Sequence, residues 1–241
     1  MLNKDNFIFN KNLGQNFLSS KIYLNKIDNI LQIKDRDVVE VGPGSGCLTN
    51  IILKNQPKNL ILIEKDKRLI EHLEKKYKNV SILNDDCLKL TINTDILISN
   101  LPYNISNEFL INLFFKNNVN EVYLMLQKEL CEKLILGNSY LSIILKFIFN
   151  IEILFHVPPE AFTPKPKVYS SFIFMKKHNE IIIENKHKLF NLLKRLFENK
   201  NKKIINILNL KNNDNIPEYI KELRPMHCSM EDFILLSNLL K

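Results

Sequence analysis

A glycine-rich turn constrains the fold of this chain more than any other stretch. Residues 37–46 read Asp-Val-Val-Glu-Val-Gly-Pro-Gly-Ser-Gly, and they hold three of the five glycines among 241 residues. The mostly apolar residues 38–41 predict a short buried strand, and the spacing of Leu48, Ile51 and Ile52 predicts a helix directly after the glycines. A glycine turn lets the backbone approach a ligand, and the helix N-terminus offers free N–H groups. The turn therefore predicts an α/β unit with a ligand site between strand and helix.

The glycine spacing indicates the kind of ligand. The dinucleotide fingerprint G-x-G-x-x-G needs its third glycine where this chain has Cys47, and here that glycine comes one residue early, at Gly46. The spelling E-x-G-x-G-x-G instead resembles the first motif of the class I methyltransferases, which bind S-adenosylmethionine over such a loop. This resemblance implies a Rossmann-like fold with a seven-stranded, mostly parallel sheet, and cofactor contacts from Gly42 and Gly44. A purely structural glycine turn is the alternative.

The net charge and the cysteine and histidine patterns limit the functions that this chain can have. The chain carries 34 Lys and Arg against 26 Asp and Glu, a net charge of +8 that favours a polyanion such as nucleic acid. A general compositional bias toward lysine is the alternative. The four cysteines form no C-x-x-C pair and the five histidines have no metal-ligand spacing, so we expect reduced thiols and no metal. Without a signal or membrane-spanning pattern, we expect a cytoplasmic protein, or an organellar matrix protein if a targeting extension was removed.

Acidic residues follow two predicted strands. Residues 60–63 form an apolar run that ends at Glu64, 20 residues past the second glycine of the turn, where a carboxylate can accept hydrogen bonds from two ribose hydroxyls. A third predicted strand, 80–83, is followed by Asp85 and Asp86. An acid here can accept from the adenine amino group of the cofactor, although Asp85 could equally cap a helix. The resemblance aligns Asp86 with the family's single Asp, so Asp86 is the predicted adenine ligand.

The stretch Asn-Leu-Pro-Tyr carries the most specific chemistry of the sequence. It follows a fourth predicted strand, 95–99, and open α/β sheets place their sites at such strand ends. An exocyclic adenine nitrogen is a poor nucleophile, and the side-chain carbonyl of Asn100, which we also expect to contact the cofactor, can accept its hydrogen bond. Pro102 restricts Leu101 to extended conformations, which aims the Leu101 carbonyl at the same amino group. Tyr103 offers a stacking face worth about 1 to 3 kcal/mol. A tight turn is the alternative.

Three motifs together resemble one family. L-G-Q-N-F-L, E-V-G-P-G-S-G-x-L-T and N-L-P-Y-N-I-S are similar to the small-subunit (16S) ribosomal RNA adenine dimethyltransferases, the kasugamycin-sensitivity dimethylases, across nearly the whole chain. Macrolide-resistance methylases usually lack the loop proline, and DNA adenine methylases typically spell D-P-P-Y or N-P-P-Y. The resemblance implies methyl transfer from S-adenosylmethionine to N6 of two adjacent adenosines in the 3′-terminal hairpin loop of small-subunit rRNA. It further implies a monomer that acts on a pre-ribosomal particle during ribosome biogenesis.

The N-terminal motif adds cofactor residues, and one later loop departs from the family. The family's G-Q-N-F-L stretch covers the methionine end of the cofactor, which implies contacts from Gln15, Asn16 and Leu18. Where relatives usually have Y-G-x-L-S, this chain has Asn-Ser-Tyr-Leu-Ser at 138–142. Without the Tyr-Gly pair, the family does not predict the conformation of that loop. The predicted chemistry does not depend on it.

A proline-rich loop is predicted to supply a second aromatic group. Four prolines stiffen residues 158–168 and predict that Phe162 is exposed beside Lys165 and Lys167, two lysines that we also expect to contact RNA. The loop resembles the family's A-F-x-P-x-P-K-V, whose Phe faces the tyrosine of the N-L-P-Y motif across the flipped base. This implies that Phe162 and Tyr103 hold an extruded adenine between them. A Phe packed in the core is the alternative.

Past Lys176 the pattern changes from strands to helices. Lys200, Lys202 and Lys203 occupy the place of an arginine-rich run in relatives, and we expect them to contact RNA phosphates. An ordinary solvated face is the alternative. Ser229 is the predicted N-cap of a final helix. The predicted organisation is a loose arm at 1–10, a methyltransferase domain at 11–177 and a small helical RNA-binding domain at 178–241.

Two other functions remain open from the sequence. One is a macrolide-resistance type enzyme that acts on large-subunit RNA. The other is an RNA-binding assembly or transcription factor that keeps the fold without its chemistry. The intact Asn100 to Tyr103 stretch, Glu64 and Asp86 favour an enzyme over the second alternative.

Overall fold

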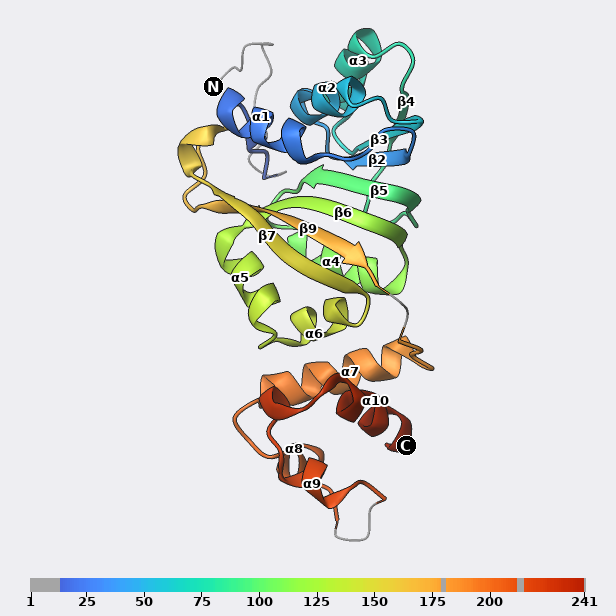
Figure 1. Ribbon diagram of the computed structural model, residues 1–241, viewed down its shortest axis with the longest axis vertical. Coiled ribbons are helices and arrows are strands. Elements are labelled where there is room, and N and C mark those ends of the chain that lie inside the picture. The colour runs from blue at the N-terminus through green and yellow to red at the C-terminus, as the bar shows by residue number, and fades with distance from the viewer. Residues whose placement is uncertain (1–13, 179–180, 212–214, 241) are drawn as a thin grey trace. The chain divides into compact units, whose positions relative to one another are not determined.

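The computed structural model describes residues 14–178, 181–211 and 215–240 (Figure 1). The loose arm predicted at 1–10 lies outside the described residues. The chain divides into two compact units, of which the first contains residues up to Cys131 together with Asn150–Lys177. The second unit contains Glu132–Phe149 and the residues from His178 onward. It therefore includes a helical segment from the middle of the sequence in addition to the C-terminal residues.

The first unit is built on a seven-stranded sheet with the strand order β4-β3-β2-β5-β6-β9-β7 (Figure 1). Strands β2 to β6 run parallel to their neighbours, and β9 runs antiparallel to β6. This confirms the predicted Rossmann-like fold with a mostly parallel sheet, in which the last strand of the chain inserts between β6 and β7. The strands are β2 (Asp37–Val41), β3 (Asn59–Glu64), β4 (Ser81–Asn84), β5 (Asn93–Asn100), β6 (Asn118–Gln127), β7 (Phe149–Val157) and β9 (Ser170–Lys177).

Apolar side chains on both faces of the central strands explain why helices cover the sheet on both sides. In β5, Ile96, Leu97 and Ile98 are all fully buried, as expected for a strand of a parallel sheet. Figure 1 shows α1, α2 and α3 on one side of this sheet and α4 on the other. These helices are α1 (Lys21–Ile30), α2 (Cys47–Lys54), α3 (Lys67–Lys76) and α4 (Ser106–Phe115), and α5 (Lys128–Leu136) follows β6.

A short two-stranded ribbon links the N-terminal segment to the proline-rich loop. Strand β1 (Phe17–Leu18) pairs antiparallel with β8 (Phe162–Thr163), so that Leu18 lies opposite Phe162. The backbone N–H groups of Ser19 and Ser20 both donate to the Ala161 carbonyl, at 2.9 and 3.1 Å. A 3-10 turn, η2 (Pro159–Ala161), leads into β8. The ribbon fixes the first described residues onto the body of this unit.

The second unit is helical, and side chains cap α6, α7 and α10. Ser139 caps α6 through a reciprocal capping box with Ser142, so the serine that departs from the family spelling has a structural role. Ser229 caps α10 in the same way with Asp232, which confirms the predicted N-cap. None of the helices in the described ranges is both long and apolar enough to cross a bilayer. The helices are α6 (Tyr140–Lys146), α7 (Lys186–Glu198), α8 (Ile204–Leu208), α9 (Glu218–Glu222), η3 (Pro225–His227) and α10 (Met230–Leu239).

Candidate active site

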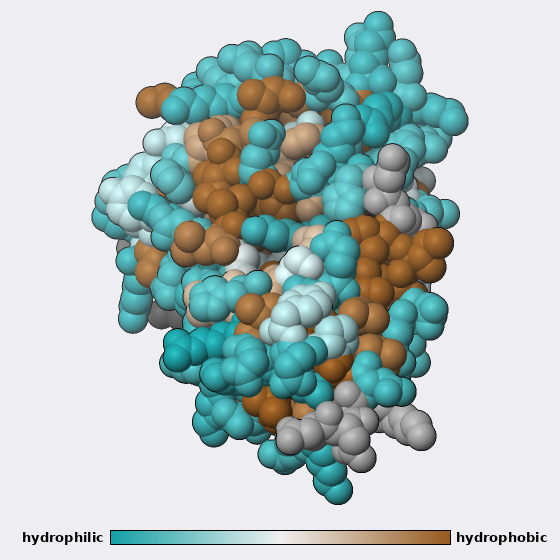
Figure 2. Space-filling view, turned by 60° about the horizontal axis from the view of Figure 1, so that its bottom comes forward, coloured by the Kyte–Doolittle hydropathy of each residue, from teal (hydrophilic) through white to brown (hydrophobic). Residues whose placement is uncertain are grey.

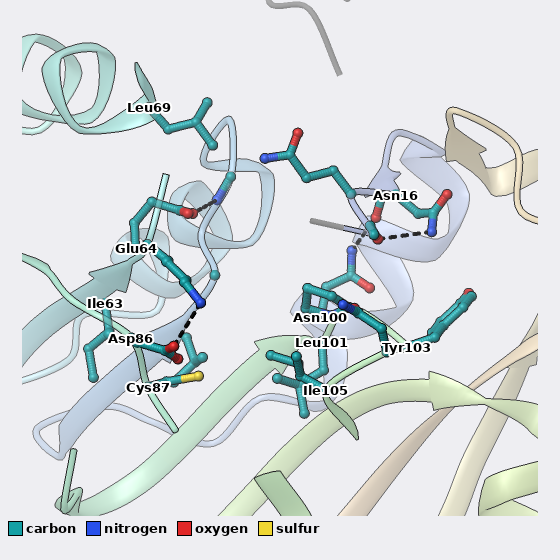
Figure 3. A pocket seen from close by; sticks show the side chains of 18 of the residues that line it. Asn16, Ile63, Glu64, Leu69, Asp86, Cys87, Asn100, Leu101, Tyr103 and Ile105 are labelled. Carbon is teal, nitrogen blue, oxygen red and sulfur yellow. Dashed lines mark hydrogen bonds and ion pairs between the residues drawn. The ribbon is translucent and has the colours of Figure 1, made fainter. Parts of the chain in front are cut away.

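A pocket opens at the carboxyl ends of β2, β3 and β5, within the first unit (Figure 3). Two sets of side chains face each other across it. We call Glu64 and Asp86, with their neighbours Ile63 and Cys87, the acidic wall, and residues 100–105 the loop wall. Ten of the predicted site residues line this one pocket: Gln15, Asn16, Gly42, Gly44, Glu64, Asp86, Asn100, Leu101, Pro102 and Tyr103. The topology of the sheet therefore brings together residues that are widely separated in the sequence.

Two glycines of the turn, Gly42 and Gly44, have different surroundings. A Cβ added at Gly42 would meet no atom within 4 Å, and this residue lines the pocket, so its backbone faces open space. A Cβ at Gly44 would lie 2.2 Å from the ring of Phe17, another lining residue. Both glycines also adopt positive φ, of 65° and 59°, where a side chain is strained. The absence of a side chain at Gly44 thus makes room for the Phe17 ring. At Gly42 it leaves space for a ligand in the pocket.

Glu64 is a buried carboxylate held by backbone donors. It is 7% exposed, and it accepts the N–H of Gly44 at 3.2 Å on Oε2 and that of Asp66 at 2.8 Å on Oε1. Burial raises the pKa of Glu64 above its usual range, although these backbone hydrogen bonds oppose the shift. Each carboxylate oxygen can accept a second hydrogen bond. A ligand with two hydroxyl groups would therefore satisfy an acceptor that the fold has removed from water.

Asp86 is oriented by two donors. Its Oδ1 accepts the N–H of Leu88 at 3.1 Å, and its Oδ2 accepts from the ammonium of Lys65 at 2.7 Å. Burial acts to raise the pKa of Asp86, but the Lys65 and Leu88 hydrogen bonds outweigh it and the pKa is lowered. Asp85 also lines the pocket, where its Oδ1 accepts the N–H of Asp86 at 2.7 Å. Asp86 therefore stays ionised as an acceptor, while Asp85 supports the turn that carries it.

Asn100 is held with a defined orientation at the end of β5. Its Nδ2 donates to the carbonyl of Asn16 at 2.7 Å, and Asn16 in turn donates through Nδ2 to the Gly14 carbonyl at 3.2 Å. Because the Asn100 amide nitrogen is engaged, its Oδ1 is the atom left to accept from a ligand. The predicted role of Asn100 as an acceptor for an amino group is consistent with this geometry.

The segment Gly14–Leu18, which we call the strap, runs beside the pocket. Gln15 donates through Nε2 to Asp66 Oδ2 at 3.0 Å, and Asp66 also forms an ion pair with Arg68 at 2.6 Å. The Arg68 hydrogen bond lowers the pKa of Asp66 against the effect of burial. Leu18 does not line the pocket, because its side chain is 2% exposed and belongs to the hydrophobic core. Leu18 instead lines a smaller cavity together with Gly42 and Asn100, and its cofactor contact stays a prediction.

Tyr103 projects from the loop wall with its ring partly exposed. Its hydroxyl oxygen lies 2.6 Å from the Oγ of Ser170, at the start of β9. Burial raises the pKa of Tyr103, and the Ser170 hydrogen bond opposes the shift. The side chain is therefore a neutral aromatic group at physiological pH, as a stacking surface requires.

The expectation that Phe162 is exposed is wrong. Its side chain is 3% exposed, belongs to the same core as Leu18, and is absent from the residues that line the pocket. The prolines do stiffen the loop, but the pairing of β8 with β1 turns Phe162 inward. The structure thus gives the packed core Phe that the sequence left as the alternative, and the stacking of Phe162 on a flipped base stays a prediction.

Sequence reasoning missed most of the apolar lining. Ile63 and Cys87 stand directly beside the predicted acids, so their positions could have been inferred from the strand ends. Phe17 and Ile105 belong to quoted motifs but were given no role. Leu69 comes from the first turn of α3, and no sequence signal points to it. These side chains give the pocket an apolar surface between its polar ends.

The predicted RNA-binding lysines lie on the surface and outside the pocket. Lys165 forms an ion pair with Glu160, and Lys203 forms one with Glu222. These carboxylates partly neutralise the positive charge of the two lysines. Lys167 and Lys202 are exposed, and Lys200 is partly exposed. Hydrophilic side chains cover much of the face seen in Figure 2. Among the residues that the structure describes, no three His, Cys, Asp or Glu side chains are grouped to hold a metal ion.

Known proteins resemble this chain in both sequence and fold. A family model described as ribosomal RNA adenine dimethylase matches residues 6–240. The chain is 36% identical over 238 residues to the ribosomal RNA small subunit methyltransferase A of Hydrogenobaculum sp., covering 95% of this chain and 92% of the relative. A dimethyladenosine transferase from Plasmodium falciparum superposes with a TM-score of 0.79 at 26% identity, covering 91% of this chain and 95% of the other.

A second solved structure has the same fold at a lower sequence identity. The 23S rRNA methyltransferase ErmE superposes with a TM-score of 0.70 over 92% of this chain and 99% of the other, but at 19% identity this likeness shows the fold alone. The family model and the curated relative, by contrast, both match almost the full length at the level of sequence. The family predicted from the three motifs is confirmed, and the chain belongs to the ribosomal RNA adenine dimethylase family.

Proposed function

We propose that this protein is an S-adenosylmethionine-dependent enzyme that transfers methyl groups to N6 of adenosines in small-subunit ribosomal RNA. The observation that carries the proposal is the shared pocket, in which the acidic wall and the loop wall face each other (Figure 3). The name of the curated relative supports the small subunit as the source of the RNA. The hydrogen bond that fixes the Asn100 amide, with Oδ1 left as its acceptor, supports an enzyme over a fold without chemistry.

The residues of the acidic wall fit the cofactor. Glu64 offers two buried acceptor oxygens to the ribose hydroxyls, and Asp86 offers an ionised acceptor to the adenine amino group. Gly42 leaves open space beside them, and the strap residues Gln15 and Asn16 complete the surface toward the methionine end. When bound, the cofactor supplies a methyl group on a positively charged sulfur.

The loop wall would orient the nucleophile. Asn100 Oδ1 and the Leu101 carbonyl accept hydrogen bonds from the amino group of the target adenine, which favours the pyramidal nitrogen that attack requires. Tyr103 stacks on the extruded base, and the polar strand end holds it in line with the donor. No strong base is needed, because the product amine releases its proton after transfer. The rate enhancement comes mainly from positioning, an effect worth up to about 7 to 11 kcal/mol in favourable systems.

The finer substrate assignment follows the family. The protein acts as a monomer on a pre-ribosomal particle and modifies two adjacent adenosines in the 3′-terminal hairpin loop of its rRNA. Phosphates of this RNA contact surface lysines in both units. Such contacts fix the position of an RNA without reading its sequence. The lysines are Lys165 and Lys167 in the first unit and Lys200, Lys202 and Lys203 in the second.

Methyl incorporation tests the proposal. Purified protein is incubated with labelled S-adenosylmethionine and, in parallel, with unmethylated small-subunit particles or large-subunit RNA. The nucleosides are then identified by mass spectrometry. Dimethyladenosine in the small-subunit sample alone is the expected result. Dimethyladenosine in the large-subunit sample would assign the macrolide-resistance activity instead, and binding without incorporation would favour an assembly factor.

A further inference from the structure

Tyr103 is connected to a distant strand through its hydroxyl group. The Tyr103 oxygen lies 2.6 Å from Ser170 Oγ, and the two residues are 67 positions apart in the sequence. Ser170 is fully buried at the start of β9, where its backbone pairs with Gln127 of β6. The hydroxyl pair therefore joins the loop wall to a rigid part of the sheet.

This contact holds the aromatic ring at both ends. The backbone of the loop is fixed on one side, because Pro102 accepts hydrogen bonds from the Ile105 N–H and from the Ser106 hydroxyl, each at 3.2 Å. On the other side, Ser170 fixes the phenolic oxygen. A side chain fixed at its backbone and at its phenolic oxygen cannot swing about χ1 away from the pocket, which Tyr103 lines.

The neighbouring serine shows that β9 does not need a tyrosine to satisfy a buried hydroxyl. Ser171 is also fully buried, and its Oγ lies 2.8 Å from His156 Nδ1. Successive side chains of a strand point to opposite faces, so the two serines serve different partners. Only the Ser170 hydroxyl meets a side chain of the pocket, which distinguishes it from general packing of the strand.

We propose that Ser170 is a positioning residue that holds the Tyr103 ring as the stacking surface for the target adenine. This inference rests on the proposed function, since it concerns the base that would be methylated. It assigns no contact between Ser170 and the substrate. Its effect passes through the orientation of Tyr103.

A double-mutant cycle tests the proposal, with Ser170→Ala, Tyr103→Phe and the double variant. Each single change removes one hydroxyl of the pair, and we expect each to lower kcat/KM for the RNA about fivefold, the rate equivalent of one intramolecular hydrogen bond. The double variant should lose no more than either single variant. Ser171→Ala is the matched control, because it removes an equally buried hydroxyl from the same strand, and its kcat/KM should stay near that of the wild type.

Two further measurements separate positioning from folding and from the proposed function. Calorimetry should give the same S-adenosylmethionine affinity in all five proteins. NMR of proteins with labelled tyrosine residues should show that the Tyr103 side chain samples more χ1 rotamers in Ser170→Ala but not in Ser171→Ala. Multiplicative losses in the double variant, equal effects of the two serine changes, or an unchanged Tyr103 ring would each overturn the proposal. If the wild type transfers no methyl group, the proposed function fails. The NMR comparison still tests whether Ser170 holds Tyr103 in place.

Discussion

The two walls of the pocket are built in different ways. The acidic wall comes from the ends of adjacent parallel strands, so the sheet itself places Glu64 and the loop that carries Asp86 at one edge. The loop wall comes from a single connection after β5, and its expected aromatic partner, Phe162, lies in the core instead. Residues at the ends of buried strands can therefore be placed from sequence, whereas a residue in a loop depends on what the loop pairs with.

The largest expected effect concerns the loop wall. Asn100→Ala removes the acceptor that orients the amino group, and we expect methyl transfer to fall at least about 100-fold, the loss typical of a misplaced reactant. Affinity for S-adenosylmethionine, measured by calorimetry, should change little. Asn93→Ala is a matched control at the opposite end of β5. A loss of cofactor affinity as large as the loss of transfer would show that Asn100 mainly belongs to the acidic wall's task of holding the donor.

The next effect concerns the acidic wall. Glu64→Gln keeps the shape of the side chain but removes the charge that accepts two hydroxyl hydrogen bonds, and we expect S-adenosylmethionine to bind about tenfold more weakly. Glu71→Gln, on the exposed face of α3, serves as the control. Equal affinities of the wild type and Glu64→Gln in calorimetry would refute the ribose assignment.

A smaller effect distinguishes Phe162, which we expect to matter for stability, from Tyr103, which we expect to matter for methyl transfer. Phe162→Leu keeps an apolar side chain in the core, and we expect the free energy of unfolding to fall by about 1 kcal/mol in urea denaturation. Tyr103→Leu should instead lower methyl transfer, because it removes the stacking ring from the pocket. If Phe162→Leu lost more than about tenfold in transfer while it stayed folded, Phe162 would have to leave the core and meet the base.

A last effect, on the pH dependence of stability, concerns the strand that precedes the glycine turn. Glu40 is 1% exposed and accepts a hydrogen bond from Thr49 at 2.6 Å, and burial raises its pKa from 4.5 to about 8. Between these two values the folded protein holds a proton that the unfolded chain has released. Its free energy of unfolding should therefore fall as the pH rises through this range. Glu40→Gln should flatten that dependence in denaturation curves measured at several pH values, and parallel curves for the two proteins would contradict the assignment.

Much of the fold and of the donor site could be predicted because the signals are local. The glycine turn, the apolar strands and the acids that follow them are each read from a few adjacent residues, and parallel pairing then brings them to one edge. The inward turn of Phe162 could not be read in this way, because it depends on a ribbon between β1 and β8. The same pairing buries the side chain of Leu18, which no local pattern predicts.

Other features of the site required tertiary structure for a different reason. A Cβ at Gly44 would collide with Phe17, so this glycine is explained by a side chain of the strap rather than by a ligand alone. The pairing of Tyr103 with Ser170 joins residues that no shared pattern connects. Leu69 reaches the pocket only because α3 begins at its rim. In each case the partner is distant in the sequence, and composition carries no trace of the contact.

The most direct test of this account is a calorimetric titration of S-adenosylmethionine into the wild-type protein without RNA. The account holds that the sheet alone assembles the acidic wall, so we expect one cofactor molecule to bind per chain, and to bind nearly as well to Asn100→Ala but more weakly to Glu64→Gln. If no binding occurs until RNA is added, the donor site is not built by the strand ends, and the distinction between the two walls fails.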